Sequence, residues 1–271
     1  MNRSEYHHTH LNPQLGSFPF YRLFPSIMTI IGMCLGLFAL KYGIAGDWTR
    51  AVMLIILAGI IDGLDGKIAR LFNAASPFGA QLDSLADFLN FGLVPALLVY
   101  FWKIQELKAL GWAAVLFFIV CQAIRLARFN AKIDVEPEIP ELKYKFFEGV
   151  AAPMGGGLIL FPIMLTFLFE EHFDAPLFNI TPIGVTIYMM VMGLLMVSRI
   201  PTFSLKGIKI SRRHTSLLLA GIGLFIIAAI TEPWIFFPFL SVLYLITIPW
   251  CCYRYYYLKA KYQAARKLKK V

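Results

Sequence analysis

Long runs of apolar residues recur along the chain and are separated by short polar segments. Eight runs are long enough to cross about 30 Å of hydrocarbon as helices. We expect these spans at residues 24–42, 48–72, 77–102, 110–129, 150–169, 182–197, 215–230 and 234–253. The pattern therefore predicts an all-α polytopic membrane protein with about eight transmembrane helices.

The polar segment between the second and third runs is very short. It ends in Ser76 and Pro77, which suit the N-cap and the first position of a helix. We therefore expect the second and third spans to form an antiparallel hairpin.

Composition supports a membrane protein. Of 271 residues, 59% are hydrophobic and only 15% are charged, which is too few charges for an ordinary soluble domain. Residues 1–22 contain no apolar run that could serve as a cleaved signal peptide. We interpret the histidines within them, His7, His8 and His10, as part of a polar terminus rather than as a metal site.

Positive charges are distributed unevenly across the predicted spans. If residues 1–23 are cytoplasmic, the same side receives all but four of the 25 Lys and Arg. Because such residues concentrate in cytoplasmic loops, we expect both termini in the cytoplasm. The basic tail, 259–271, follows a membrane span, which favours contact with anionic lipid headgroups over nucleic acid.

Four carboxylates interrupt the second and third spans. Residues three or four apart share a helix face, so Asp62 and Asp65 form one stripe, and Asp83 and Asp87 form another. Counting from the turn at about 1.5 Å per residue, both pairs lie roughly 10 Å below the cytoplasmic surface. Such carboxylates repel one another unless cations neutralise them, and oxygen-only ligands suit Mg²⁺, Mn²⁺ or Ca²⁺. The sequence therefore predicts a site for one or two metal ions.

Small residues and one cation accompany these carboxylates. Gly66, Ala69 and Gly79 leave room for a nucleotide or its diphosphate to approach the helix backbone, and Arg70 can neutralise a diphosphate oxygen. Alternatively, the glycines only allow close helix packing, and Arg70 only anchors the span at the membrane boundary. Their fixed spacing to four Asp residues favours the ligand site.

The spacing Asp-x2-Asp-Gly-x2-Ala-Arg-x8-Gly-x3-Asp-x3-Asp, from Asp62 to Asp87, resembles the signature of the CDP-alcohol phosphatidyltransferases. These membrane enzymes transfer a phosphatidyl or phospho-alcohol group from a cytidine diphosphate donor to an alcohol. The resemblance implies a core of six helices at 24–201, preceded by segment 1–23 and followed by additional helices at 202–258 and the tail.

The resemblance also implies roles for the motif residues. Asp62, Asp65 and Asp83 would bind Mg²⁺ or Mn²⁺, and Asp87 would be the general base and also touch a metal. The donor CDP-diacylglycerol would lie against Asp65, Gly66, Ala69, Arg70 and Gly79. A homodimer in the bacterial cytoplasmic (inner) membrane is the expected assembly.

Residues 82–87, 125–130, 146–150 and 196–201 resemble the branch of this family that uses L-serine and releases CMP. A serine pocket needs a cation for the carboxylate and acceptors for the ammonium group. We expect these groups to come from Arg125, Arg128, Asn130 and Glu148. The alternative, that Arg125 and Arg128 only anchor the fourth span, stays open.

Because the motif contains no obvious Ser, His or Cys nucleophile, we expect the acceptor hydroxyl to attack phosphorus directly. Other acceptors stay possible within this chemistry: glycerol 3-phosphate, inositol phosphate or choline. A divalent-cation transporter is the alternative from another class, since carboxylates within a membrane also mark ion pathways. It explains the Asp residues but not the accompanying glycines and arginine.

Overall fold

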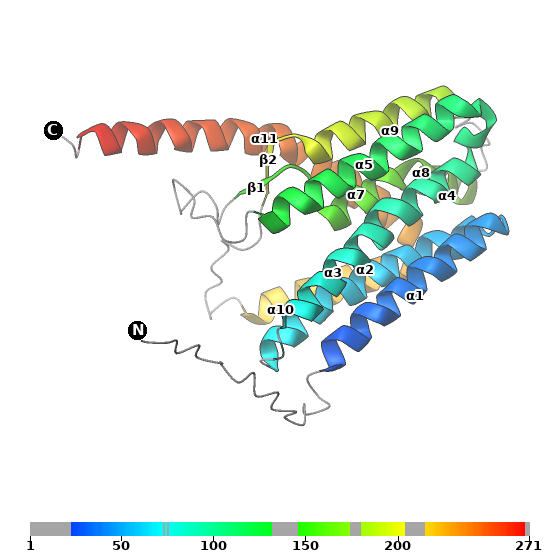
Figure 1. The fold of residues 1–271 in the computed structure, drawn as a ribbon, viewed down its shortest axis with the longest axis horizontal. Helices are drawn as coiled ribbons and strands as arrows, with labels where there is room; N and C mark the ends of the chain where they lie inside the picture. The colour runs from blue at the N-terminus through cyan, green and yellow to red at the C-terminus, as the bar shows by residue number, and fades with distance from the viewer. Residues whose placement is uncertain are drawn as a thin grey trace, which may run out of the picture.

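A computed structural model describes residues 23–72, 74, 76–131, 146–173, 180–203 and 215–268. Helices make up almost all of this part of the chain and lie side by side in a bundle (Figure 1). The helices are α1 (Phe24–Ile44), α2 (Trp48–Leu71), α3 (Pro77–Phe88), α4 (Val94–Trp102), α5 (Ala109–Ala131), α7 (Ala152–Ile159), α8 (Phe161–Phe173), α9 (Pro182–Val197), α10 (Thr215–Thr231) and α11 (Pro233–Leu268).

Each expected span corresponds to one helix or to a pair of consecutive helices, so the all-α membrane architecture is confirmed. Four helical segments of the described chain are long and apolar enough to cross a membrane, or five if the bent pair α7–α8 forms one span. The expected count of eight is not confirmed, because α9 and α10 are short and α2 carries the charged motif. The protein is an integral membrane protein.

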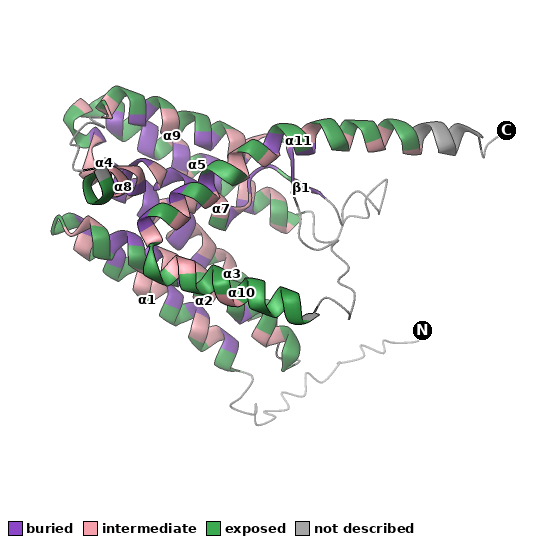
Figure 2. Cartoon of the chain, turned by 180° about the vertical axis from the view of Figure 1, so that it is seen from behind, coloured by how far each residue is buried: buried purple, intermediate pink, exposed green. Residues whose placement is uncertain are grey.

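The outer surface of the bundle is apolar, as lipid contact requires. Figure 2 shows exposed residues along the outward sides of the helices. On α10, for example, Leu217, Leu224 and Ile230 are about 70% exposed. Water would disfavour such a surface, whereas hydrocarbon accommodates it.

The turn before α3 has the predicted cap. Ser76 is the N-cap, its Oγ accepts a hydrogen bond from the Gly79 backbone N–H at 3.0 Å, and Pro77 follows in the first turn. Because the cap fixes where α3 begins, it also fixes which residues of α3 face α2.

The third expected span is one continuous helical segment, Pro77–Trp102, with a local irregularity. A π-helical turn, Leu89–Leu93, joins α3 to α4, and its residues Asn90, Phe91 and Gly92 are buried. Helix α7 packs against this turn so closely that a Cβ on Gly156 would lie 2.7 Å from the Phe91 Cα. The backbone approach of α7 to the middle of the bundle thus depends on a glycine.

We predict that Gly156→Ala lowers the free energy of unfolding by about 1–3 kcal/mol, the usual cost of overpacking a core. Gly157→Ala is the matched control, because a Cβ there meets no atom within 4 Å. Thermal unfolding of the purified proteins in detergent measures the difference. Equal stability of the two variants would contradict the close packing of α7 on the π-helical turn.

The fifth expected span is bent rather than straight. Helices α7 and α8 meet at an angle of 47° around Leu160. Pro162 lacks the N–H that would reach the Leu158 carbonyl in a continuous helix. The Tyr188 hydroxyl of α9 donates a hydrogen bond to this carbonyl at 2.6 Å instead, so a side chain satisfies the backbone group that the bend leaves open.

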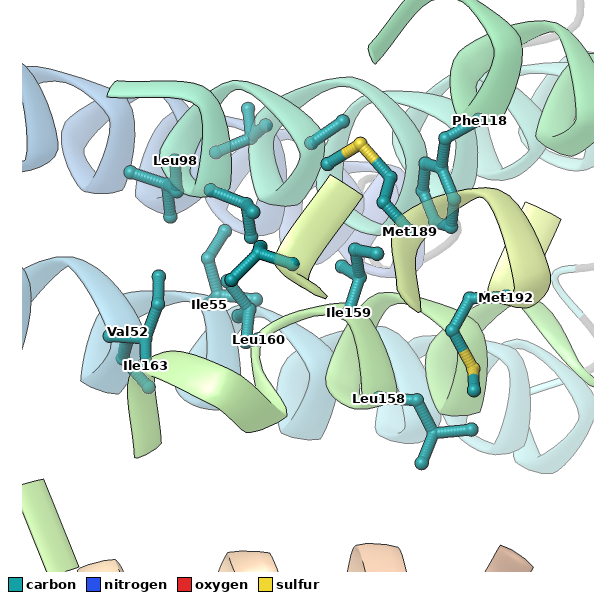
Figure 3. Close-up of a cluster of buried hydrophobic side chains, with 14 of the residues drawn as sticks. Val52, Ile55, Leu98, Phe118, Leu158, Ile159, Leu160, Ile163, Met189 and Met192 are labelled. Carbon is teal, nitrogen blue, oxygen red and sulfur yellow. The ribbon is translucent and has the colours of Figure 1, made fainter. Parts of the chain in front are cut away.

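The core lies where α2, α4, α5, α7, α8 and α9 converge (Figure 3). The largest fully buried side chains include Leu98, Phe118, Ile159, Ile163 and Met189. In Figure 3, Met189 lies near Phe118, and Ile159 and Leu160 extend from the bend between α7 and α8. This packing fixes the positions of the helices relative to one another, and so fixes the positions of the polar side chains that they carry.

A short antiparallel ribbon, which the apolar pattern did not predict, joins two loops. Strand β1 (Phe146–Glu148) pairs with β2 (Pro201–Phe203). After β1, Gly149 has φ +73°, and a Cβ there would lie 2.8 Å from the Met196 and Ser198 carbonyl oxygens. Only glycine tolerates both the left-handed backbone and this approach.

Helix α11 continues well beyond the expected end of the last span. It runs past the ribbon and extends from the bundle as a single helix to Leu268 (Figure 1). The start of α1, the start of α3 and the end of α5 lie toward the same side of the bundle. The predicted basic tail is therefore helical up to that residue.

Candidate functional site

Carboxylates from α2 and α3 meet at one point. One oxygen from each of Asp62, Asp65 and Asp83 lies within 4.8 Å of the other two. Metal–oxygen distances of about 2.0–2.6 Å place ligands on opposite sides of one ion about 4–5 Å apart. The three side chains can therefore hold a divalent cation, although they lie on two helices separated by a turn.

One member of the cluster is buried and two are partly exposed, and its polar atoms are not all satisfied. Asp65 is only 3% exposed, and its Oδ2 accepts a hydrogen bond from the Thr29 Oγ1 of α1 at 2.7 Å. Asp62 Oδ1 is buried and has no hydrogen-bond partner among the described residues. A buried oxygen without a hydrogen-bond donor suits a cation, so this set of carboxylate oxygens fits a divalent metal ion.

Asp87 lies one turn beyond Asp83 on α3 and does not belong to the group of three close oxygens. It is half-buried. Its charge is repelled by the Asp83 carboxylate and attracted by the Arg125 guanidinium of α5. Asp87 thus interacts electrostatically both with the carboxylate cluster and with a cation from another helix.

The remaining motif residues leave one side of the cluster open. Gly66 is exposed, and a Cβ there would meet no atom within 4 Å. Arg70, one turn away and exposed, donates from Nε to the Gly66 carbonyl at 3.0 Å. Ala69 is half-buried, and Gly79 lies in the first turn of α3. These residues lie on α2 and at the start of α3, the two helices that carry the carboxylates, and their contact with the donor stays a prediction.

The four residues expected in a serine pocket lie in different surroundings. Arg125 donates from Nε to the Val150 carbonyl at 2.7 Å, and Arg128 donates to the Val197 carbonyl of α9. Asn130 donates to the Ser84 Oγ of α3 at 3.1 Å, whereas Glu148 is exposed at the end of β1. Among them, Arg125 interacts electrostatically with Asp87 of the motif.

The sequence did not identify two hydrogen-bonding residues of the site, Thr29 and Ser84. Thr29 holds Asp65, and Ser84 fastens α3 to the end of α5. Ser84 directly follows Asp83, so its position beside the motif was a usable signal. Thr29 lies in an unremarkable apolar span, where no spacing marks it.

Comparison with known proteins decides the family. The family model for CDP-alcohol phosphatidyltransferase matches residues 22–249, which include the whole carboxylate motif. The chain belongs to the CDP-alcohol phosphatidyltransferase family. The resemblance drawn from the spacing of the motif is confirmed.

Individual members of the family are similar to this chain over most of its length. A protein of Mycobacterium tuberculosis (strain ATCC 25618 / H37Rv) is 34% identical over 84% of this chain and 77% of its own. A protein of Mycobacterium leprae is 31% identical over 90% and 79%. One of Helicobacter pylori (strain ATCC 700392 / 26695) is 33% identical over 70% and 76%. All three are named CDP-diacylglycerol–serine O-phosphatidyltransferase.

Proposed function

We propose that this protein transfers the phosphatidyl group of CDP-diacylglycerol to L-serine, giving phosphatidylserine and CMP. Membership of the family supports the reaction class, and the names of the three relatives support serine as the acceptor. The observation that carries the proposal is the meeting of three carboxylate oxygens within 4.8 Å at the family motif. That arrangement suits the binding of a diphosphate through a cation.

In this proposal, Asp62, Asp65 and Asp83 hold Mg²⁺ or Mn²⁺, as one or two ions. Bound metal would neutralise charge on the diphosphate and on the departing CMP. Thr29 orients Asp65 through its hydrogen bond, and orienting bonds of this kind typically strengthen metal binding. Burial of Asp65 limits the access of water to its carboxylate.

The donor binds along α2. The backbone at Gly66 is open and leaves room for the diphosphate or the nucleotide. Ala69 and Gly79 have small side chains or none, so they leave space for the donor beside it. Arg70 is exposed one turn away and supplies a positive charge to a phosphate oxygen. The acyl chains remain in the bilayer beside the apolar outer surface.

Asp87 is the general base for the acceptor hydroxyl. As the serine oxygen forms its bond to the phosphatidyl phosphorus, Asp87 accepts the hydroxyl proton and the bond from phosphorus to CMP breaks. One bond forms and one breaks, so no covalent enzyme intermediate is needed. The Asp87 carboxylate would hold the serine hydroxyl next to the carboxylate cluster, where the phosphorus would lie.

Arg125 binds the serine carboxylate. Serine carries its hydroxyl and carboxylate on adjacent carbon atoms, so its base and its cation must be neighbours. The electrostatic attraction between Asp87 of α3 and Arg125 of α5 supports this pairing. Arg128 and Asn130 hold α5 against α9 and α3, and the predicted contact of Glu148 with the ammonium group stays a prediction.

We predict that Gly66→Leu raises the KM for CDP-diacylglycerol at least about tenfold, equivalent to about 1.4 kcal/mol of binding free energy. The new side chain would occupy the space left for the donor without disturbing the fold. Gly221→Leu is the matched control, since a Cβ there is equally unhindered but lies on α10, outside the helices that carry the motif. Michaelis constants in mixed micelles measure both variants, and equal constants would place the donor elsewhere.

We also propose an orientation. The side that receives the starts of α1 and α3 and the end of α5 would be the cytoplasmic side of the bacterial inner membrane, because the predicted positive charges gather there. Both termini would then be cytoplasmic. The six-helix core at 24–201, the added helices at 202–258 and the homodimer implied by the resemblance belong to the same proposal.

The function is tested by CMP release from CDP-diacylglycerol by the purified protein with Mg²⁺ or Mn²⁺. L-serine, glycerol 3-phosphate, inositol phosphate and choline are compared as acceptors. We expect release only with L-serine, together with phosphatidylserine as product. Release with another acceptor would retain the metal site and refute the serine assignment, whereas no release with any acceptor would refute phosphatidyl transfer.

A further inference from the structure

Helix α11 contributes a buried hydroxyl group close to the proposed acceptor site. Tyr244 is half-buried and packs against the core. Its hydroxyl oxygen is buried beside the Thr202 hydroxyl and the Ala151 backbone, yet it makes no hydrogen bond of regular geometry within the described residues. A buried phenol normally has a hydrogen-bond partner of regular geometry, and a ligand can supply one for Tyr244.

A second unsatisfied donor lies next to it. Arg125 uses Nε for the Val150 carbonyl, but its Nη1 is buried and has no hydrogen-bond partner among the described residues. Arg125 interacts electrostatically with both Tyr244 and Asp87. Two hydrogen-bond donors without partners, Tyr244 Oη and Arg125 Nη1, therefore accompany the proposed base Asp87.

The backbone around these donors is firmly held. The Thr202 Oγ1 donates to the Gly149 carbonyl at 2.7 Å, and the Gly149 N–H donates to the Ile200 carbonyl at 2.8 Å. Together with the bond from Arg125 to Val150, these contacts fasten the segment between β1 and α7 to β2, against which α11 packs. The two donors are therefore presented on a rigid frame rather than on a loop tip.

We infer that Tyr244 Oη and Arg125 Nη1 together form the carboxylate subsite for the acceptor, so that α11 completes the acceptor site. A carboxylate accepts several hydrogen bonds at once, and a guanidinium combined with a phenol provides both charge and direction. The acceptor hydroxyl on the adjacent carbon then faces Asp87. This inference rests on the proposed use of serine, and it names a specificity-determining residue outside the family motif.

The test replaces Tyr244 by Phe, which keeps the ring and removes the hydroxyl. We expect the KM for L-serine to rise about tenfold, in keeping with the loss of a hydrogen bond to a charged group. The KM for CDP-diacylglycerol and the kcat at saturating serine should stay within about twofold of the wild type. Steady-state kinetics with each substrate varied in turn measure these constants.

Tyr188→Phe is the matched control, because it removes another buried hydroxyl whose bond goes to the Leu158 carbonyl instead. It should leave the KM for serine unchanged. An unchanged serine KM in Tyr244→Phe, or an equal rise for both substrates, would overturn the inference while wild-type activity with serine still supports the proposed function. Wild-type protein that does not use serine would refute the proposed function, and this inference with it.

Discussion

Replacing Asp83 by Asn is expected to reduce serine-dependent CMP release at least about 100-fold. The substitution keeps the size of the side chain but removes the charge of one of the three clustered carboxylates. Loss of residues that merely orient metal ligands costs about 10–100-fold, and the loss of a ligand should cost more. Initial rates with Mg²⁺ and Mn²⁺, at saturating CDP-diacylglycerol and serine, measure the effect.

Asp47→Asn provides the control for this substitution. Asp47 caps the start of α2, where it accepts a hydrogen bond from the Arg50 backbone N–H at 3.1 Å, and Asn is an equally good cap. Its activity should match that of the wild type. If Asp83→Asn retained full activity with either ion, the carboxylate cluster would not be the catalytic metal site.

Replacing Asp87 by Asn is expected to lower kcat about 10²–10⁴-fold, the usual contribution of a general base. Because Asp87 is not among the three close carboxylates, affinity for Mn²⁺ and for CDP-diacylglycerol should change much less than turnover. Single-turnover rates of CMP release measure the chemical step, and equilibrium binding of the donor is measured on the same preparation.

Ser84→Ala is a useful comparison with Asp87→Asn. It removes the hydroxyl that accepts a hydrogen bond from Asn130, and so loosens α3 from α5 without touching a carboxylate. A small loss of stability with near-normal turnover is expected. If Asp87→Asn weakened metal and donor binding as much as it slowed turnover, Asp87 would be a metal ligand rather than the base.

Much of the fold was readable from sequence because the bilayer imposes a simple rule. Backbone groups in hydrocarbon must be paired within the chain, so long apolar runs become helices, and α9 has the expected bounds. The cap at Ser76 followed from local chemistry that needs no distant partner. Helical periodicity alone likewise placed the motif residues on one face of each helix.

The features that were missed depend on residues far apart in the chain. The bend at Leu160 follows from Pro162, yet it is stabilised by the Tyr188 hydroxyl from another helix. The ribbon of β1 and β2 joins two loops that have no apolar pattern of their own. Such pairings cannot be deduced from the periodicity of either segment.

The candidate site divides in the same way. The spacing of the carboxylates predicted where a cation could bind, because both halves of the cluster lie on consecutive helices joined by a short turn. The acceptor side needed tertiary information: Arg125 lies near Asp87, whereas Arg128 is bonded to the Val197 carbonyl and Tyr244 comes from a helix whose sequence carried no signal. Of the residues predicted to form the serine pocket, Arg125 interacts with the proposed base Asp87, whereas Arg128 and Asn130 hold α5 against α9 and α3.

We propose above all that the carboxylates of α2 and α3 hold the metal ion on which CDP-diacylglycerol is bound. Titration of Mn²⁺ into the purified full-length protein in detergent, with free Mn²⁺ followed by electron paramagnetic resonance, tests it most directly. We predict that the wild type binds Mn²⁺ more tightly when CDP-diacylglycerol is present. The double substitution Asp62→Asn and Asp83→Asn should abolish this binding. Equal Mn²⁺ affinity of the wild type and the double variant would contradict the claim.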